Sequence, residues 1–296
     1  MSPPNLNPLI LVPPPSPGPL LRAEHVTLEY KGEHGVVRAT EDVSFEVHRG
    51  DRFVLLGPSG CGKSTLLKAV GGFIAPQAGS LTLGGKAISR PGPDRIVVFQ
   101  EFDQLPPWKT VRENVMFPLL AGGVKRKEAD QRARHWLGKV GLARFADAYP
   151  HTLSGGMKAR VAIARALAMQ PEVLLMDEPF AALDALTRRT MQEELQALWD
   201  GIGFTMLFVT HSIEEALVVG NRILLLSPHP GRVRAELNSH QFSLASAGSS
   251  EFQAATQRIH GLLFGGQAEH AGVDRAVGGA CVGPLVQRTP TKVVNE

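Results

Sequence analysis

The chain has 296 residues, of which 43% are hydrophobic and 20% charged, and its net charge is +3. This composition is typical of a globular protein with a buried core, and the small charge argues against a nucleic-acid partner. The two cysteines, Cys61 and Cys281, match no metal-binding spacing and indicate a reducing compartment rather than a disulfide framework. No apolar run reaches the roughly 18–20 residues that are needed to cross a bilayer.

The chain opens with a proline-rich stretch and then becomes strand-like. Residues 1–20 lack the basic start of a signal peptide, and we expect them to form a disordered leader. Alternating or continuously apolar segments then predict strands. These segments are 23–30, 43–47, 51–57, 80–85 and 94–100, with a helix over 63–73 that ends at a glycine pair.

The middle of the chain has helical periodicity, and strands return after it. Helices are predicted within 111–120, 126–142 and 155–169, and we interpret about 101–163 as an inserted helical subdomain. Apolar strands over 172–177, 205–210 and 222–227 alternate with helices near 185–200 and 212–219. Buried strands that alternate with helices favour an α/β fold with a mostly parallel sheet.

The end of the chain adds one more predicted helix. Residues 239–265 are interpreted as a helical extension, because Phe252, Ile259 and Leu263 share one face of a helical pattern. Residues 266–296 are rich in Gly and Ala without periodicity, so we expect a disordered tail. The tails, 1–20 and about 266–296, are expected to be dispensable for catalysis.

A glycine-rich loop follows the strand over 51–57. The pattern Gly57-x-x-x-x-Gly62-Lys63-Ser64 lies between a predicted strand and a predicted helix, which is the context that a phosphate-binding loop requires. Backbone N–H groups and the helix N-terminus would bind phosphate oxygens. Lys63 would contact the β- and γ-phosphates, Ser64 would hold Mg²⁺, and Thr65 could add a phosphate contact.

Two acidic residues directly follow the apolar strand over 172–177. Asp177 is predicted to bind Mg²⁺ through a water molecule, and Glu178, whose side chain points elsewhere, to polarise an attacking water. His211 and Gln100 each end another predicted strand, at the sheet edge where ligands bind in such folds. We therefore expect His211 near the γ-phosphate and Gln100 near Mg²⁺ or water.

A second predicted anion-binding helix begins at "LSGGM". Ser154 can cap this helix, whose first turn contains Gly155 and Gly156. One ATP does not need two such sites from the same subunit. Two subunits that face each other could each supply one, which predicts a pair of shared sites.

Together these motifs resemble the nucleotide-binding subunits of ABC transporters over roughly residues 21–235. The resemblance rests on the loop 57–65, Gln100, "LSGGM", "LLMDEP", "ALD" at 182–184 and "FVTH" at 208–211. It implies a P-loop NTPase core over 21–238, with a mostly parallel sheet, an antiparallel β-subdomain and the inserted helical subdomain. It also implies ATP and Mg²⁺ as cofactors.

The resemblance also assigns roles to single residues. Glu178, His211 and Gln100 match catalytic positions, and Ser64, Gln100 and Asp177 match metal-binding positions. The nucleotide-binding set is Tyr30, which stacks on adenine in the family, and Gly57, Pro58, Ser59, Gly60, Cys61, Gly62, Lys63, Ser64, Thr65, Ser154, Gly155, Gly156 and Asp184. Ser154–Gly156 would cover ATP on the opposite subunit, and Asp184 would lie in the loop that crosses the dimer.

The finer pattern resembles the ATPases of nitrate, sulfonate and taurine importers. The stretches "VVFQEFDQLPPWKTVRENV", "MDEPFAALDALTR", "THSIEEAL" and "SPHPGRV" carry this similarity, as does Met157, where most ABC ATPases have Gln. The sequence departs from the group at Ala159, Ala181 and Pro106, where Gln, Gly and Leu are usual. None of the three positions contacts phosphate or metal in the family.

The resemblance implies partners and a location. They are a second copy of the chain, membrane permease subunits that dock near Gln100–Leu119, and indirectly a solute-binding protein, at the cytoplasmic face of the membrane. Trp108 and Phe117 are expected at the docking groove, and a second interpretation of Trp108, compatible with the first, is a buried anchor of the helical subdomain. The transported solute is left open.

Two other functions use the same kind of phosphate-binding loop. One is an ABC ATPase that acts on DNA or ribosomes, which usually carries tandem ATPase domains, a coiled coil or basic extensions. The other is a phosphoryl-transferring P-loop kinase, which "LSGGM" argues against.

Overall fold

The computed structural model describes residues 18–32, 35–99 and 104–264. Its strands are β1 (Leu21–Gly32), β2 (Gly35–Val47), β3 (Arg52–Leu56), β4 (Ala78–Leu83), β5 (Lys86–Ala87), β6 (Arg95–Val98), β7 (Val173–Asp177), β8 (Met206–Thr210), β9 (Arg222–Leu226) and β10 (Val233–Asn238). Its α-helices are α1 (Lys63–Val70), α2 (Val111–Ala121), α3 (Arg126–Lys139), α4 (Gly155–Ala168), α5 (Ala185–Ile202), α6 (Ile213–Val219) and α7 (Ser250–Phe264).

A six-stranded sheet forms the centre of the molecule, with the order β10-β9-β3-β8-β7-β6. The strands from β9 to β6 pair in parallel, and β10 pairs antiparallel with β9 at one edge. The parallel strands β3, β7 and β8 therefore end at the same edge of the sheet. The expected α/β fold with a mostly parallel sheet is confirmed, and its strand ends bring distant parts of the sequence together.

The inner strands are buried on both faces, which explains their continuous apolar runs. Alternate residues point into two different hydrophobic cores, in keeping with the two-residue period of a strand. The first core takes Val54, Leu56, Leu174, Met176, Met206, Phe208, Ile223 and Leu225 from the sheet. The second core takes Phe53, Leu55, Val173, Leu175, Leu207, Val209, Leu224 and Leu226.

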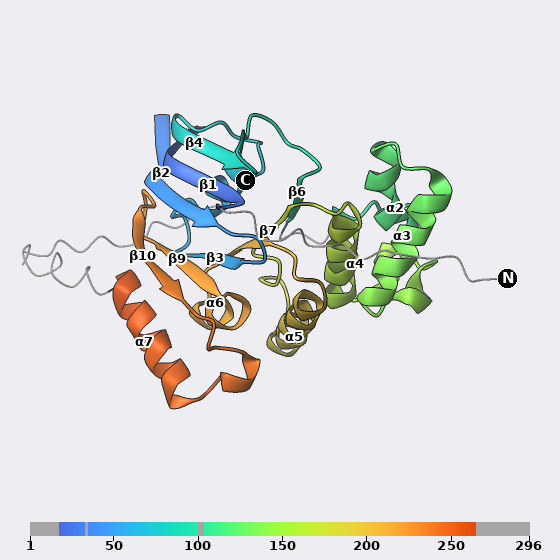
Figure 1. Cartoon of the computed structure of the whole chain (residues 1–296). Helices are drawn as coiled ribbons and strands as arrows, with labels where there is room; N and C mark the ends of the chain where they lie inside the picture. The colour runs from blue at the N-terminus through green and yellow to red at the C-terminus, as the bar shows by residue number, and fades with distance from the viewer. Residues whose placement is uncertain (1–17, 33–34, 100–103, 265–296) are drawn as a thin grey trace, which may run out of the picture.

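The second core lies between the central sheet, α1 and a separate antiparallel sheet. That sheet has the order β2-β1-β4-β5, with all its neighbouring strands antiparallel. Its buried residues, among them Val26, Leu28 and Val43, belong to the second core together with Leu66 and Leu67 of α1. This sheet is the expected antiparallel β-subdomain, and Figure 1 shows it as the layer over β3 and β9.

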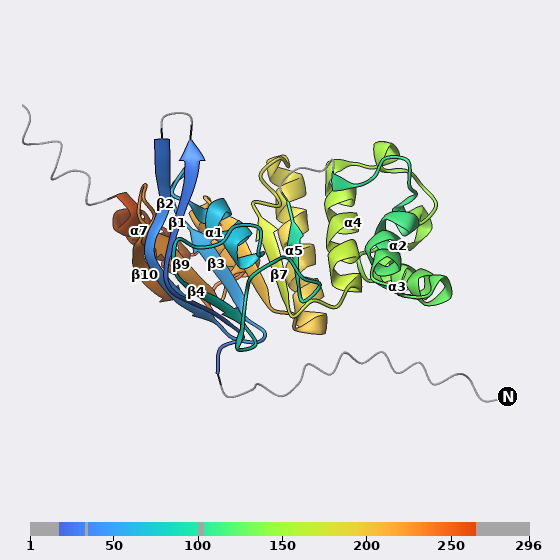
Figure 2. The same ribbon diagram turned by 90° about the horizontal axis from the view of Figure 1, so that it is seen from above.

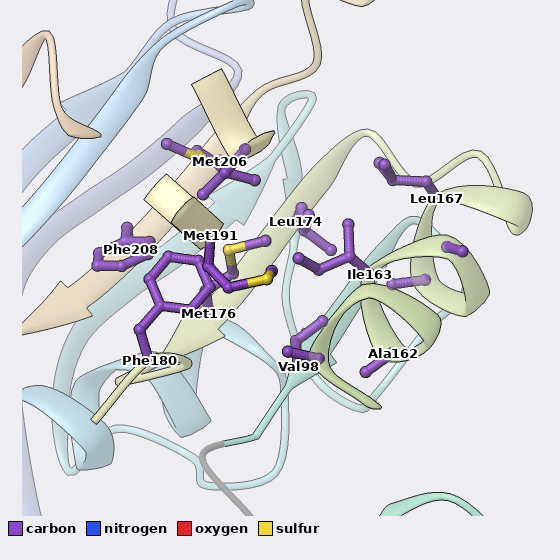
Figure 3. Packing of buried hydrophobic residues seen from close by; sticks show 14 of the residues in the cluster. Val98, Ala162, Ile163, Leu167, Leu174, Met176, Phe180, Met191, Met206 and Phe208 are labelled. Carbon is purple, nitrogen blue, oxygen red and sulfur yellow. The ribbon is translucent and has the colours of Figure 1, made fainter. Parts of the chain in front are cut away.

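The first core lies on the opposite face and joins the central sheet to helices α2–α7. Figure 3 shows Ala162, Ile163 and Leu167 of α4 beside Leu174 and Met176 of β7. Helix α4 also contacts α2 and α3, and in Figure 2 it lies between α5 and this pair. Through α4, the helices of the inserted segment are connected to the sheet by continuous apolar packing.

The two tryptophans of the inserted helical region have opposite environments. Trp136 is only 4% exposed and packs in the first core, whereas Trp108 is 74% exposed. Trp108 precedes α2 and lies outside any helix, so no helical face turns it inward. The interpretation of Trp108 as a buried anchor is therefore wrong, and Trp136 fills that role.

The C-terminal part of the described chain holds one predicted element and one that the sequence did not indicate. Helix α7 buries Phe252, Ile259 and Leu263, the three residues expected on its inner face. Strand β10 was not predicted, because none of its residues is buried and its pattern is correspondingly weak. In the part of the chain that the structure describes, no helix combines the length and apolar character needed to span a membrane.

Candidate active site

The loop between β3 and α1 is packed too closely for side chains at two of its glycines. A Cβ atom on Gly62 would lie 2.5 Å from the carbonyl oxygen of Ala39, and one on Gly57 would lie 2.8 Å from Sγ of Cys61. Gly62 also caps α1 with a φ of 92°, a conformation that favours glycine. Only glycine therefore lets the loop backbone approach Ala39 and Cys61 this closely, and the loop leads directly into the N-terminus of α1, where N–H groups can donate to phosphate oxygens.

A cavity of ≈ 200 Å³ opens over this loop. It is lined by Tyr30, Ala39, Ser59, Gly60, Gly62, Lys63, Ser64, Thr65 and Glu178. Eight of these nine lining residues belong to the predicted site, which the fold assembles from β1, the loop, α1 and the end of β7. The ninth, Ala39 on β2, belongs to no motif and carries no sequence signal, because its contribution is a backbone carbonyl against Gly62.

Lys63 is oriented by the loop itself. The side chain is 4% exposed, and its ammonium donates hydrogen bonds to the carbonyl oxygens of Gly57 at 2.8 Å and Pro58 at 2.9 Å. A buried ammonium needs such acceptors, because an unpaired charge would be costly to bury. The contacts hold the positive charge beneath the cavity, where it can meet a phosphate without first being ordered.

Ser64 at the start of α1 and Asp177 at the end of β7 are far apart in the sequence but form a direct contact. The hydroxyl of Ser64 donates to Oδ1 of Asp177 at 2.7 Å. Burial raises the pKa of Asp177, while the hydrogen bond from Ser64 opposes that rise and the neighbouring Glu178 adds to it. The hydroxyl and the carboxylate are therefore held together at the edge of the phosphate loop.

These two side chains fit a shared Mg²⁺ ion. Two adjacent ligands of an octahedral Mg²⁺ lie about 2.9 Å apart, and both groups offer the hard oxygen atoms that Mg²⁺ prefers. Among the described residues there is no cluster of three or more His, Cys, Asp or Glu side chains that could hold a metal alone.

Glu178 and His211 form a pair across the ends of β7 and β8. Oε2 of Glu178 lies 2.9 Å from Nδ1 of His211, and the backbone N–H of Glu178 donates to the carbonyl oxygen of Val209. The glutamate is mostly shielded from solvent, whereas the histidine side chain is 52% exposed. The sequence predicted a separate role for each residue but not their direct contact.

The residues predicted for a second nucleotide face lie outside this cavity. Ser154 caps α4 by accepting a hydrogen bond from the N–H of Met157 at 3.3 Å, as expected. Asp184 caps α5 by accepting from Leu186 and Thr187, and the hydrogen bonds from Thr187 hold the pKa of Asp184 below its ordinary value. A Cβ on Gly156 would lie 3.0 Å from Cγ2 of Thr187, so the starts of α4 and α5 are adjacent.

Gln100 lies outside the described residues, and only the residues on either side of it can be placed. Gln104 donates from its side-chain amide to the carbonyl oxygen of Phe99 at 3.1 Å. Arg165 of α4 donates to both the backbone and the side-chain oxygen of Gln104, each at 2.8 Å. The residues that flank the segment 100–103 are thus attached to α4.

The three departures from the subgroup pattern have ordinary structural settings. Ala159 is buried in the first core, so a polar side chain there would need a partner. The carbonyl oxygen of Ala181 accepts from Arg188, and that of Pro106 accepts from Asn114 and Lys109. The N-terminal cap of α4 is formed in spite of Ala159.

Comparison with known proteins gives a consistent result. Residues 40–181 match the family described as ABC transporter. The taurine import ATP-binding protein TauB of Rhizobium johnstonii is 50% identical over 220 residues, which cover 74% of this chain and 84% of that protein. The bicarbonate transport ATP-binding protein CmpD of a Synechocystis species is 44% identical over 225 residues, which cover 75% and 79%.

A solved structure agrees with the same assignment. The dimeric ATP-binding cassette MJ0796, in a post-hydrolysis state bound to ADP and Pi, superposes with a TM-score of 0.64 at 34% identity. The match covers 75% of this chain and 100% of that chain. The fold that carries the phosphate loop, the Ser64–Asp177 contact and the Glu178–His211 pair is therefore similar to that of this ATP-binding cassette. The chain therefore belongs to the family of ABC transporter ATP-binding subunits, which bind and hydrolyse ATP.

Proposed function

We propose that this chain energises a membrane importer of small anions of the nitrate, sulfonate and taurine type. The observation that carries the proposal is the 50% identity with a taurine import ATP-binding protein, over 84% of that protein's length. The bicarbonate transport protein among the relatives is also named for a small anion. Because the relatives are named for different anions, they do not identify a single transported solute.

In the proposed reaction, ATP binds with its phosphates on the loop 57–65 and its adenine near Tyr30. Mg²⁺, held by Ser64 and Asp177 with help from Gln100, would neutralise charge that develops on the phosphates. Glu178 accepts a proton from the attacking water, and His211 orients Glu178 and reaches toward the γ-phosphate. Lys63 contacts the β- and γ-phosphates in place of its present carbonyl partners.

The proposed active unit is a dimer of two copies of the chain. Ser154, Gly155, Gly156 and Asp184 do not line the cavity over the phosphate loop, yet Ser154 is exposed at the N-terminus of α4, and a helix N-terminus suits a phosphate group. In a dimer, these residues of one copy would cover the nucleotide that is bound to the other. The dimeric state of the similar solved cassette supports this arrangement.

The proposed permease contact is the surface near residues 100–119. Phe99, Trp108, Phe117 and Leu120 are exposed there, and Nζ of Lys109 lies 5.2 Å from the centre of the Phe117 ring. Three exposed aromatic residues in one region are typical of a surface that binds another protein. The chain would then act peripherally on the cytoplasmic side of the membrane, and a solute-binding protein would act on the other side.

The alternatives have less support. An ABC ATPase that acts on DNA or ribosomes is not suggested by the transport proteins that the chain resembles. A P-loop kinase is excluded by the family to which the chain belongs.

Uptake in cells that lack this chain tests the proposal. Deletion should abolish ATP-dependent uptake of at least one of labelled taurine, an alkanesulfonate, nitrate or bicarbonate, and the parent chain should restore it.

Glu178→Gln should not restore uptake, because the amide cannot accept a proton, and its ATPase rate should fall about 10²–10⁴-fold with ATP binding retained. Glu172→Gln, an exposed glutamate at the other end of β7, is the matched control and should behave as the parent. Unchanged uptake of all four solutes after deletion would contradict anion import.

A further inference from the structure

Two helices of this chain begin with the same four-residue pattern but use it differently. At α2, Thr110 and Glu113 form a complete capping box, in which each side chain accepts from the other's backbone N–H at 3.2 and 3.0 Å. At α6, Ser212 accepts from the N–H of Glu215 at 3.3 Å, but its own N–H donates to Oγ1 of Thr210 at 3.0 Å. Thr210 thus replaces Glu215 in the cap, and the Glu215 carboxylate is free for another contact.

The Glu215 side chain turns into the protein instead. It is 7% exposed, and its Oε1 accepts a hydrogen bond from Nε2 of Gln192 on α5 at 3.0 Å. Burial raises the pKa of this carboxyl, and the neighbouring Thr210, Gln192 and Arg188 side chains oppose the rise. Arg188 makes no ion pair with this carboxylate, whose direct side-chain partner is the neutral Gln192, and burying a carboxylate in this way costs free energy that an apolar side chain would not cost. A function other than stability is therefore the better explanation for it.

Glu215 lies directly behind the candidate catalytic residues. Its backbone N–H donates to Ser212, whose own N–H donates to Thr210, and Thr210 is buried and immediately precedes His211, whose ring is 2.9 Å from Glu178. On the other side, Gln192 lies one turn after Arg188 on α5. Arg188 donates to the carbonyl oxygens of Phe180 at 3.2 Å and Leu183 at 2.8 Å. These carbonyls belong to the segment that leads from Glu178 to Asp184.

We infer that Glu215 is a positioning residue for ATP hydrolysis. It connects the end of β8, which carries His211, to α5, which holds the segment 180–184. His211 and Asp184 thereby keep fixed positions on either side of Glu178. The inference rests on the ATPase reaction proposed above. Because Glu215 touches neither the phosphate loop nor the cavity, its loss should slow turnover without weakening nucleotide binding.

The first test is Glu215→Gln, with kcat and KM for ATP measured on the full chain. The amide keeps the shape but removes the negative charge, so the charge-assisted hydrogen bond from Gln192 is lost. We expect kcat to fall about tenfold, the effect of one lost hydrogen bond, with KM within about twofold of the parent. Glu214→Gln makes the same charge change at the exposed neighbour on α6 and should leave both constants within about twofold.

Two further variants separate positioning from simple support of the fold. In Glu215→Gln combined with Gln192→Glu, the carboxylate and the amide exchange places, so the charge-assisted hydrogen bond between α5 and α6 can form again. This pair should recover kcat to within about threefold of the parent. Thr210→Val removes the hydroxyl that accepts from the N–H of Ser212, which breaks the connection between the end of β8 and the start of α6, and should lower kcat at unchanged KM. It provides the test if Glu215→Gln does not fold.

The results separate the positioning role of Glu215 from the proposed function of the chain. An active parent with an unchanged kcat in Glu215→Gln, even with a lower melting temperature, would overturn the positioning role and leave the proposed function intact. A rise in KM at constant kcat, or an exchanged pair that stays slow although its melting temperature recovers, would overturn it as well. A parent chain that hydrolyses no ATP would instead refute the proposed function, and this inference with it.

Discussion

Glu178 has a left-handed backbone conformation, with a φ of 44°, at the point where β7 ends. Such a conformation costs of order 1–3 kcal/mol for a residue with a side chain, and it persists only where the surroundings fix it. Here the hydrogen bond to Val209 and the contact with His211 fix it. The turn directs Glu178 toward the cavity while Asp177 stays beside Ser64, so two adjacent carboxylates serve different purposes.

The phosphate loop offers a matched pair of glycines for a prediction at this scale. Gly60 and Gly62 both have positive φ, but only a Cβ on Gly62 would meet backbone atoms, whereas the space around Gly60 is open. Gly60→Ala should therefore cost about 1 kcal/mol of unfolding free energy, and Gly62→Ala clearly more, with loss of ATP binding. Urea unfolding and nucleotide titration would measure both effects. Equal losses for the two variants would show that the contact with Ala39 does not matter.

Much of the site could be predicted from single residues, because each sequence motif contains groups that must contact the same nucleotide. The loop 57–65 and the pair Asp177 and Glu178 are of this kind. The conformation of Glu178 and its contact with His211 could not be predicted, because they depend on which strands are neighbours. Glu215 matched a capping pattern in the sequence, and only the packing of α5 against α6 reveals its different use.

At the scale of elements, the helical region shows what periodicity can and cannot establish. Trp136 follows Ala129 and Ala133 at helical intervals, and all three are buried in α3. Trp108 lies between elements, where no period applies, and its exposure depends on the arrangement of α2 and its preceding turn. Strand β10 was missed for a related reason, because an exposed edge strand has no buried face to leave a pattern.

The two tryptophans give a prediction about this region. Trp136→Ala should cost about 3–5 kcal/mol of unfolding free energy, because it leaves a cavity in the first core. Trp108→Ala should change it by no more than about 0.5 kcal/mol, yet it should reduce solute uptake if the exposed ring docks on the permease. Denaturant unfolding and uptake assays on both variants would measure this. Normal uptake with Trp108→Ala would remove the residue from the proposed docking surface.

At the scale of the whole molecule, the two candidate phosphate-binding helix starts do not share a cavity. The start of α1 lies under the cavity lined by Tyr30 and Glu178, while Ser154 at the start of α4 is exposed and lines no part of it. The sequence predicted both helix starts and the need for two copies. The dimer itself is a proposal that rests on this separation and on the dimeric relative.

Mixing two inactive variants tests the shared site. Lys63→Ala damages the phosphate loop, and Ser154→Arg damages the covering face, so each variant alone should hydrolyse little ATP. A mixed dimer contains one site with both faces damaged and one with both intact, and should therefore recover part of the activity. ATPase assays over a range of mixing ratios and concentrations would detect the recovery. Full activity of Ser154→Arg at high dilution would refute the shared site.

The alternation of the central strands between two cores has a consequence for how the chain can vary in length. In β3, β7 and β8, neighbouring residues such as Leu55 and Leu56 belong to opposite cores. A one-residue insertion within any of these strands would exchange the two sets of side chains and displace Asp177 or His211 from the sheet edge. Natural and engineered length changes should therefore accumulate in the connections between elements, while the spans from Arg52 to Leu56, Val173 to Asp177 and Met206 to Thr210 keep a constant length.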